Sequence, residues 1–405
     1  MHEWKALLAT GPFRAFWLAL LANNLGNWCV IATLPILVAS RFGAGEELVL
    51  SLGLRVLPKI VLAPFAGDLL RRLGATVISG RSLAGLGVLT TLLPWCDSFL
   101  TLQILIAAIG TLDVFIMPGI LSLRGPVTPP GLEMAGNTLC SVADRLAKFA
   151  GPALGGVVLL AGFEPGFLIF GAANLFAGVA VGRLPVMEAE NGPPATGWQW
   201  ARLPLDFLRM LRADPVLVGL LVAAVTYMVM LGGLRPFLFW ANRDWYGAVD
   251  TAWTGLLAAQ GGGALIGALL AALFSARLLR WCGAYRLTLL SGMVEGGLML
   301  TLVFAANSLQ AMVILAFASM PELISTATWF TAFQRRLTPR QQAIFFSFAA
   351  PLWDVAYMTG VGFGWFYTAG LVPLWGYWAA ITLSATVPLL PLMLVRARDP
   401  SSADQ

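Results

Sequence analysis

Charged residues are scarce in this sequence. Of its 405 residues only 11% are charged and 59% are hydrophobic, whereas about a quarter of the residues are charged in an ordinary soluble domain. The mean hydropathy is +0.81. This composition excludes a soluble globular protein. It predicts an all-α polytopic membrane protein, because apolar runs of about 20 residues are long enough to cross a bilayer core.

Histidine and paired cysteines are also nearly missing. The single histidine is His2, and the four cysteines lie in or beside apolar segments without the spacing of a metal site or a disulfide framework. Histidine metal sites, Ser/His/Asp or Cys/His nucleophile arrangements and histidine proton relays are therefore excluded from the spans. No nucleotide-binding motif is present, so energy must come from an ion gradient or from the substrate's own gradient. We expect no cofactor, no metal and no enzymatic activity.

Long apolar runs, by contrast, are abundant. Twelve can be counted, at 13–40, 46–70, 76–95, 98–122, 133–161, 164–183, 215–240, 248–275, 284–306, 309–331, 342–368 and 372–396. The third and fourth are separated only by a short turn over 94–98. A stretch rich in proline, glycine and charge divides six runs from six. We therefore predict an N-terminal half (1–185), a cytoplasmic linker with a surface helix (186–213) and a C-terminal half (214–405).

The basic residues predict the orientation of the chain. If the N-terminus is inside, eighteen of the 25 Lys and Arg residues are cytoplasmic and only Arg41 and Arg243 face outward, as the positive-inside rule requires. Both termini are then cytoplasmic, and the net charge of +5 gives no reason to expect a nucleic-acid partner. The first run is long and flanked by charge, so we expect no cleaved signal peptide. The expected location is the inner or plasma membrane.

An internal repeat supports the division into halves. The pattern F-x-x-x-L-L-R-x-x-G-A occurs at 65–75, after the second run, and again at 274–284, after the eighth run, 209 residues later. Parallel repeats of this kind are typical of one large transporter fold, in which the substrate site lies near the membrane midplane between the halves.

The loop after the second run resembles the signature loop of the major facilitator superfamily, G-x-L-a-D-R-x-G-R-R. Gly67, Arg72 and Gly74 match this motif, whereas Arg71 stands where the motif has Asp, and its final basic pair is missing. Asp68, one turn earlier, could take over the role of the missing acid. The resemblance implies a twelve-helix fold in two six-helix halves and a gating role for this loop.

The fifth run is similar to the exporter motif g-x-x-x-G-P-x-x-G-G of the same superfamily. Residues 147–156 match it through Gly151, Pro152, Gly155 and Gly156, with Arg145 just before them. Residues 12–185 as a whole resemble the drug:proton antiporter-3 group of macrolide and siderophore exporters, although Asn27 replaces a common Asp. The resemblance implies that the Gly-Pro pair bends or seals the interface between halves. A purely structural interpretation is also open, because glycines four apart, here and at Gly263 and Gly267, let helix backbones approach closely.

Ten ionisable residues lie within the predicted spans. Each costs about 2.5 to 3.5 kcal/mol in the membrane, so each is a candidate functional residue. They are the acids Asp113, Asp144, Glu295, Glu322 and Asp354 and the bases Arg55, Lys59, Arg145, Lys148 and Arg235. Asp144 and Lys148 are one helical turn apart and could pair. Lys59 is near mid-membrane and could pair with Asp113 or Asp354, either as a static ion pair or as a coupling device.

The resemblance implies that spans one, four, seven and ten line a central cavity. Their polar residues include Asn23, Asn24, Asn27, Asp113, Arg235 and Glu322. Because an apolar cavity disfavours the charged form of a carboxyl group, Glu322 is the leading proton-carrying candidate and Asp113 the second. We expect Glu295, on the peripheral ninth span, to have a packing role, and the Arg235 side chain could snorkel to the interface.

The tryptophans divide by depth. Trp17, Trp95, Trp240, Trp245, Trp375 and Trp378 fall near span ends and fit an interfacial belt. Trp28, Phe115, Trp329 and Trp353 lie deeper and could line a cavity for a lipophilic or cationic substrate.

The leading functional prediction is a monomeric secondary transporter that exports a small amphipathic compound (a drug, macrolide or siderophore-like molecule) in exchange for protons by alternating access. Two alternatives stay open. A lysophospholipid or lipid flippase would keep the same fold. A transport-dead receptor or assembly scaffold is favoured by the altered loop and by Asn27, but the retained intramembrane acids argue against it.

Overall fold

The computed structural model describes residues 2–130, 132–185, 197–249, 251–334, 336–337 and 339–395. Within these ranges every regular element is helical and there is no β-strand. Eight helical stretches of the described chain are long and apolar enough to cross a membrane by length and composition.

The first six predicted spans each correspond to one helix. A short N-terminal helix, α1 (His2–Ala9), precedes them. The six are α2 (Gly11–Arg41), α3 (Glu46–Leu73), α4 (Ala75–Leu92), α5 (Phe99–Val127), α6 (Glu133–Leu159) and α7 (Phe163–Gly182). The short turn between the third and fourth spans is confirmed. It consists of the 3₁₀ turn η1 (Leu93–Trp95) and Ser98, whose hydroxyl caps α5 by accepting from the Thr101 N–H at 3.1 Å.

The other six spans are more segmented. The elements are α8 (Gly197–Ala213), α9 (Pro215–Trp240), η2 (Ala241–Trp245), α10 (Ala252–Leu300), η3 (Thr301–Phe304), α11 (Ser308–Ala318), α12 (Met320–Gln334), α13 (Pro339–Gly362), α14 (Gly364–Thr368), α15 (Leu374–Thr386) and α16 (Leu389–Leu392). The eighth and ninth predicted spans both lie in α10, which is broken at Gly283 (φ +71°). The tenth corresponds to α11 and α12, the eleventh to α13 and α14, and the twelfth to α15 and α16. All twelve predicted spans are therefore helical.

Two compact units make up the chain. The first unit is Met1–Gly192 with Val249–Gly261, and the second is Pro193–Ala248 with Gly262–Gln405. The first turns of α10 thus belong to the first unit, where the indole N–H of Trp253 donates to the Ala32 carbonyl oxygen at 2.7 Å. This buried hydrogen bond fixes the start of α10 against α2.

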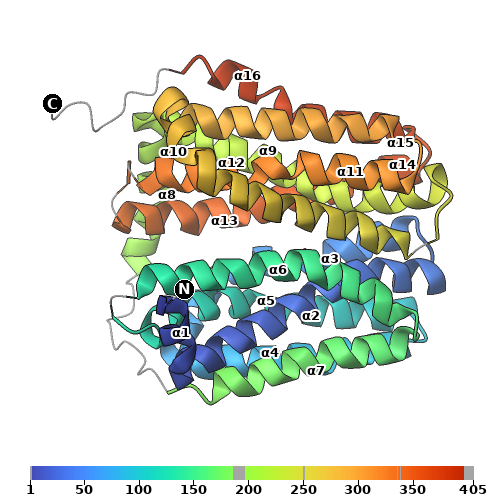
Figure 1. Cartoon of the computed structure of the whole chain (residues 1–405), viewed down its shortest axis with the longest axis horizontal. Coiled ribbons are helices and arrows are strands. Elements are labelled where there is room, and N and C mark those ends of the chain that lie inside the picture. Colours follow the sequence, from blue (N-terminus) through green and yellow to red (C-terminus); the bar gives the residue numbers. More distant parts are fainter. Residues whose placement is uncertain are drawn as a thin grey trace. The chain divides into compact units, whose positions relative to one another are not determined.

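Close helix crossings hold the first unit together. In it α2 packs against α6 and α7, α4 against α5 and α7, and α3 against α5, with their axes running in one common direction (Figure 1). A Cβ added at Gly151 would lie 2.5 Å from the Trp28 Cβ, and one added at Gly110 would collide with the Arg55 carbonyl oxygen. The predicted packing role of Gly151 is confirmed, because only a residue without a side chain allows these approaches.

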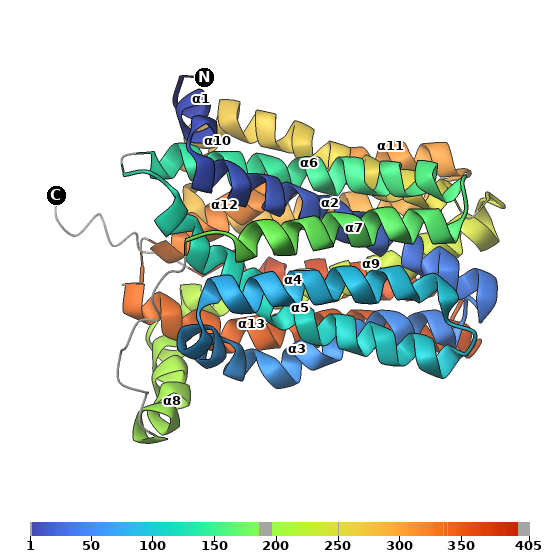
Figure 2. The ribbon, with the colours of Figure 1, turned by 90° about the horizontal axis from the view of Figure 1, so that it is seen from below.

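In the second unit α9 packs against α13 and α15. Gly263 and Gly267 of α10 lie directly against backbone carbonyl groups of α11 and α12, which confirms their predicted role. Helix α8 runs across the direction of α9 and α13 (Figure 2). Phe207 of α8 packs on Phe345 and Phe348 of α13 at ring-centroid distances of 5.6 and 5.2 Å. The predicted surface helix in the linker region is therefore present and is anchored by this aromatic contact.

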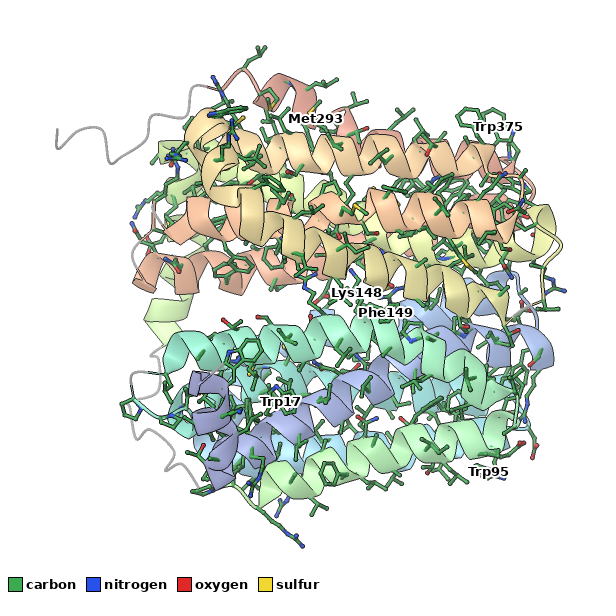
Figure 3. The ribbon with its side chains drawn as sticks, viewed as in Figure 1. Trp17, Trp95, Lys148, Phe149, Met293 and Trp375 are labelled. Carbon is green, nitrogen blue, oxygen red and sulfur yellow. The ribbon has the colours of Figure 1, made fainter. Side chains whose placement is uncertain are left out.

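The tryptophans fit the predicted belt only in part. Trp95 lies at a helix end in the first unit and Trp375 at a helix end in the second unit, and both side chains are exposed (Figure 3). Trp240 and Trp378 are buried instead. Trp378 stacks on Phe237 at 4.4 Å and donates its indole N–H to the Met299 carbonyl oxygen at 2.8 Å. For these two residues the prediction of a belt position was wrong, because proximity to a span end does not say which way a ring points.

A test of the α3–α5 crossing is the pair Gly110→Ala and Gly125→Ala on the same helix. We expect Gly110→Ala to destabilise the protein by about 1–3 kcal/mol, since the added methyl group collides with backbone that cannot retreat cheaply. A Cβ at Gly125 has no atom within 4 Å, so Gly125→Ala should be neutral or slightly stabilising. Thermal unfolding of the purified protein in detergent measures both. Equal melting temperatures for the two variants would contradict the tight crossing.

Candidate functional site

The first unit contains a polar cavity of about 310 Å³, here called the first-unit cavity. Its walls come from α2, α3, α5 and α6. The polar lining residues are Asn23, Asn24, Asn27, Lys59, Asp113, Arg124, Ser141, Asp144 and Arg145. The three cavity asparagines, Asp113 and Lys59 were all predicted from the sequence to be site residues, and the structure brings them together.

Asp113 sits between two cations. Its Oδ2 lies 3.4 Å from NH2 of Arg55 and 3.7 Å from Nζ of Lys59. Arg55 and Asp113 are 13% and 12% exposed, and Lys59 is 34% exposed. Of the two partners considered for Lys59, the structure therefore shows Asp113. The shared carboxylate offsets part of the several kcal/mol that each buried ion costs.

The asparagines on α2 extend this ion cluster. The Arg55 guanidinium donates to Oδ1 of Asn27 at 2.5 Å, and the Asn23 amide donates to Oδ1 of Asn24 at 3.4 Å. An amide has one acceptor oxygen and one donor nitrogen. The amide oxygens of Asn24 and Asn27 each accept one of these hydrogen bonds. Each side chain therefore still has its NH₂ group, which is a donor.

A second cavity, of about 200 Å³, lies within the second unit and is here called the second-unit cavity. Its lining is largely aromatic and aliphatic. Its members include Tyr227, Thr288, Glu295, Glu322, Ser325, Thr326, Trp329, Phe330 and Trp353, from α9, α10, α12 and α13. The structure thus places the leading acid, Glu322, in a cavity together with the two deep tryptophans Trp329 and Trp353.

Hydrogen bonds and ring contacts fix this aromatic wall. The indole N–H of Trp329 donates to the Leu220 carbonyl oxygen at 2.9 Å. Its ring meets Trp353 edge to face at 5.5 Å and Phe330 at 5.0 Å, a geometry that aromatic pairs prefer. The cavity is therefore bounded by rigid rings, which suit an apolar or cationic group.

Glu295 is placed differently from the expectation. It was assigned to packing on a peripheral span, but it is 1% exposed and lines the same cavity as Glu322. Asp354 lies on α13 beside Trp353. Arg235 does not simply snorkel, because its guanidinium donates to the Tyr357 hydroxyl at 2.9 Å and stacks over that ring at 5.5 Å. Arg235 thus joins α9 to α13.

The predicted loop and exporter motifs are helical in the structure. Gly67, Asp68, Arg71 and Arg72 belong to α3, and their side chains lie outside the described part of the chain. The helix ends at Gly74, whose φ of +85° favours glycine. In α6, the remaining motif residues Pro152, Gly155 and Gly156 follow Gly151 along one helix.

Helix landmarks recur at matching sequence positions in the two units. Gly74 and Gly283 both have positive φ, and a helix follows each of these glycines. These two helices end in the 3₁₀ turns η1 and η3. The side chains of Ser98 and Asn307 then cap the next helices, α5 and α11. Each pair of helix landmarks agrees with the 209-residue spacing of the sequence repeat. At this spacing Asp113 corresponds to Glu322. Arg55 and Lys59 correspond to Ala264 and Ala268.

The arrangement offers carboxyl groups, cations and amides but no metal centre. Among the described residues no three His, Cys, Asp or Glu side chains group as metal ligands would. Proton exchange and ionic binding of a small molecule are the chemistry that these side chains support.

Residues 16–361 match the Major Facilitator Superfamily, so the chain belongs to this superfamily of membrane transporters. It has the corresponding fold of twelve transmembrane helices in two six-helix halves. No curated protein matches the sequence.

Several solved transporters are similar in structure. A bacterial homologue of the human lysosomal transporter Spinster, inward-facing and unoccupied, is 14% identical, with 96% of this chain and 95% of that chain covered and a TM-score of 0.64. The peptide transporter POT in complex with sulfate is 14% identical, with 96% and 97% covered and a TM-score of 0.72. The nucleoside transporter NupG is 11% identical, with 94% and 99% covered and a TM-score of 0.70. At these identities the likeness concerns the fold alone.

Sequence reasoning did not assign two charged residues to the cavities. Arg124 lies beyond the predicted end of the fourth span at 122, but α5 continues to Val127. Glu295 was set aside because of its span number. The 209-residue spacing could have linked Asp113 to Glu322 in advance, whereas Glu295 stood out only as one of the ten intramembrane ionisable residues.

The ion cluster can be tested by a double-mutant cycle on Arg55→Met and Asp113→Asn. Removing either member leaves a buried charge without its partner, so we expect each single change to cost about 3–5 kcal/mol and the double change to cost clearly less than their sum. Lys59→Met should cost less, because Lys59 is more exposed and 3.7 Å away. Thermal or denaturant unfolding in detergent gives the comparison. Additive costs for Arg55 and Asp113 would show that the pair contributes nothing.

Proposed function

We propose that the protein is a proton-coupled exporter of a small amphipathic compound that works by alternating access. The observation that carries this proposal is the second-unit cavity, in which two carboxyl groups, Glu295 and Glu322, meet an aromatic wall. The apolar wall suits the lipophilic part of a substrate. The carboxyl groups supply proton-binding sites.

The contrast between Asp113 and Glu322 supports Glu322 as the proton carrier. The Asp113 carboxylate is held in ion pairs with Arg55 and Lys59. At the 209-residue spacing, Ala264 and Ala268 occupy the positions that correspond to Arg55 and Lys59. Glu322 instead lines a cavity together with a second carboxyl group, Glu295, and with aromatic rings. An intramembrane carboxyl group in such a cavity is a candidate for exchanging protons.

The substrate class and the subgroup are part of the same proposal. The exporter motif at 147–156 and the likeness of residues 12–185 support the drug:proton antiporter-3 group, with drug, macrolide or siderophore-like cargo. We further propose that residues 1–185 and 214–405 act as the two moving halves, joined by a cytoplasmic linker, and that a monomer in the cell membrane is the working unit.

Proton coupling can be tested in liposomes that contain a pH-sensitive dye. On addition of macrolides, lipophilic cations, siderophores or lysophospholipids, wild type should give substrate-dependent proton flux. We expect Glu322→Gln to reduce this flux at least about ten-fold, because the amide cannot carry a proton. Glu46→Gln, an exposed acid in the first turn of α3, is the matched control and should retain the wild-type flux.

The same assay separates the competing functions. Full proton flux in Glu322→Gln would contradict the assignment of Glu322. Lipid movement without proton flux would favour a lipid flippase in place of the exporter, and a lack of movement with every compound would favour the transport-dead scaffold.

The proposed orientation places both termini in the cytoplasm. In a variant with the native cysteines replaced by serine, we expect Asp97→Cys, exposed after η1, to react with a membrane-impermeant maleimide in intact cells. Trp281→Cys, exposed in α10, should react only after permeabilisation. Burial raises the pKa of the native Cys96 thiol. This cysteine therefore reacts slowly and cannot itself report the topology. Labelling in the opposite order would reverse the orientation.

A further inference from the structure

We infer that the first-unit cavity binds an anionic group, a carboxylate or a phosphate, carried by the transported amphipath. That the bound anion belongs to a substrate rests on the proposed transport function. The binding chemistry itself follows from the charges and hydrogen bonds of the cavity.

The cavity has an excess of positive charge. Lys59, Arg124 and Arg145 line it, and Arg55 reaches Asp113 from beside it. The acids on its wall are Asp113 and Asp144. Even when Arg145 is not counted, three cations face two carboxylates among the described residues, and a cleft with walls of low dielectric strengthens the attraction of such an excess for an anion.

One of those two carboxylates is already shared. Arg55 and Lys59 both contact the same oxygen of Asp113, at 3.4 and 3.7 Å. A single carboxylate offsets one unit of charge, so this trio retains a net charge of +1. Because Lys59 is the more exposed of the two cations and lines the cavity, the excess is presented to a ligand there.

The neutral polar groups point to the same ligand. Oδ1 of Asn27 accepts from Arg55, and Oδ1 of Asn24 accepts from Asn23. Their amide NH₂ groups are left as donors, and donors stabilise anions. An aspartate at position 27 would instead add a third carboxylate to the cavity, so the asparagine preserves both the donor and the positive excess.

Arg124 supplies a further donor. Its Nε is buried and has no hydrogen-bond partner among the described residues, although the side chain lines the cavity. A buried donor without an acceptor destabilises the protein. A bound anion that draws the guanidinium group toward it would remove part of that cost, which makes Arg124 the most direct residue to test.

The experiment compares two probes that differ in one group, 11-(dansylamino)undecanoic acid and its primary amide. Binding to the full-length protein in nanodiscs is followed by energy transfer from protein tryptophan to dansyl, with no pH gradient present. We expect wild type to bind the acid at least about ten-fold more tightly than the amide. Arg124→Gln and Asn27→Asp should each weaken binding of the acid about ten-fold and leave binding of the amide unchanged.

Two controls keep the result specific. Arg124→Lys retains the charge and should keep the preference for the acid, which excludes a folding defect as the cause. Arg243→Gln, exposed in η2 of the second unit, should bind both probes as wild type does. Competition by dodecanoate and by dodecyl phosphate then distinguishes a carboxylate ligand from a phosphate ligand.

Equal binding of acid and amide by wild type would overturn the inference, as would an acid preference that persists in both Arg124→Gln and Asn27→Asp. Its failure is distinguishable from that of the proposed function, because no proton movement is measured. A preference for the acid that depends on Arg124 would stand even if the liposome assay found no proton flux.

Discussion

The cost of holding charge away from water governs this structure. Each ionised side chain inside a membrane span costs several kcal/mol unless it is paired or reaches water. In the first unit the cost at Asp113 is offset by Arg55 and Lys59, which come from one face of α3 one turn apart. That arrangement requires α3 and α5 to cross closely, and Gly110 makes room by placing no side chain against the Arg55 backbone. The ion cluster and the glycine crossing are therefore one structural feature.

The two units repeat the same helix arrangement but surround the matching acids with different side chains. Positive-φ glycines, short 3₁₀ turns and capped helix starts recur at matching positions, and so does the acid, as Asp113 and Glu322. Only the surroundings differ. Basic side chains accompany Asp113, whereas alanines occupy the matching positions in the second unit and aromatic rings line the cavity of Glu322. A duplicated backbone can thus place one acid among cations and the matching acid among aromatic rings by side-chain replacement alone.

Much of this frame could be predicted from the sequence, because hydrophobic run length and the placement of Lys and Arg report directly on membrane insertion. The twelve spans, the short turn before Ser98 and the close approach at Gly151 follow from such local patterns. Side-chain direction does not. Trp378 and Glu295 were misplaced because their roles depend on which face of a helix meets a neighbour, and an almost uniformly apolar helix has little periodicity to reveal that face.

Asn27 illustrates why a departure from a family pattern need not mean lost function. Judged by titration alone, replacing a common acid with an amide favours a transport-dead protein. In the structure the amide oxygen already accepts from Arg55, and its nitrogen remains a donor beside Asp113 and Lys59. A second carboxylate there would compete with Asp113 for Arg55 and reduce the positive excess of the cavity. The amide therefore keeps the ion cluster intact and adds a donor to the cavity. Under the proposed function, the proton is carried by Glu322, so the loss of an acid at position 27 does not remove coupling.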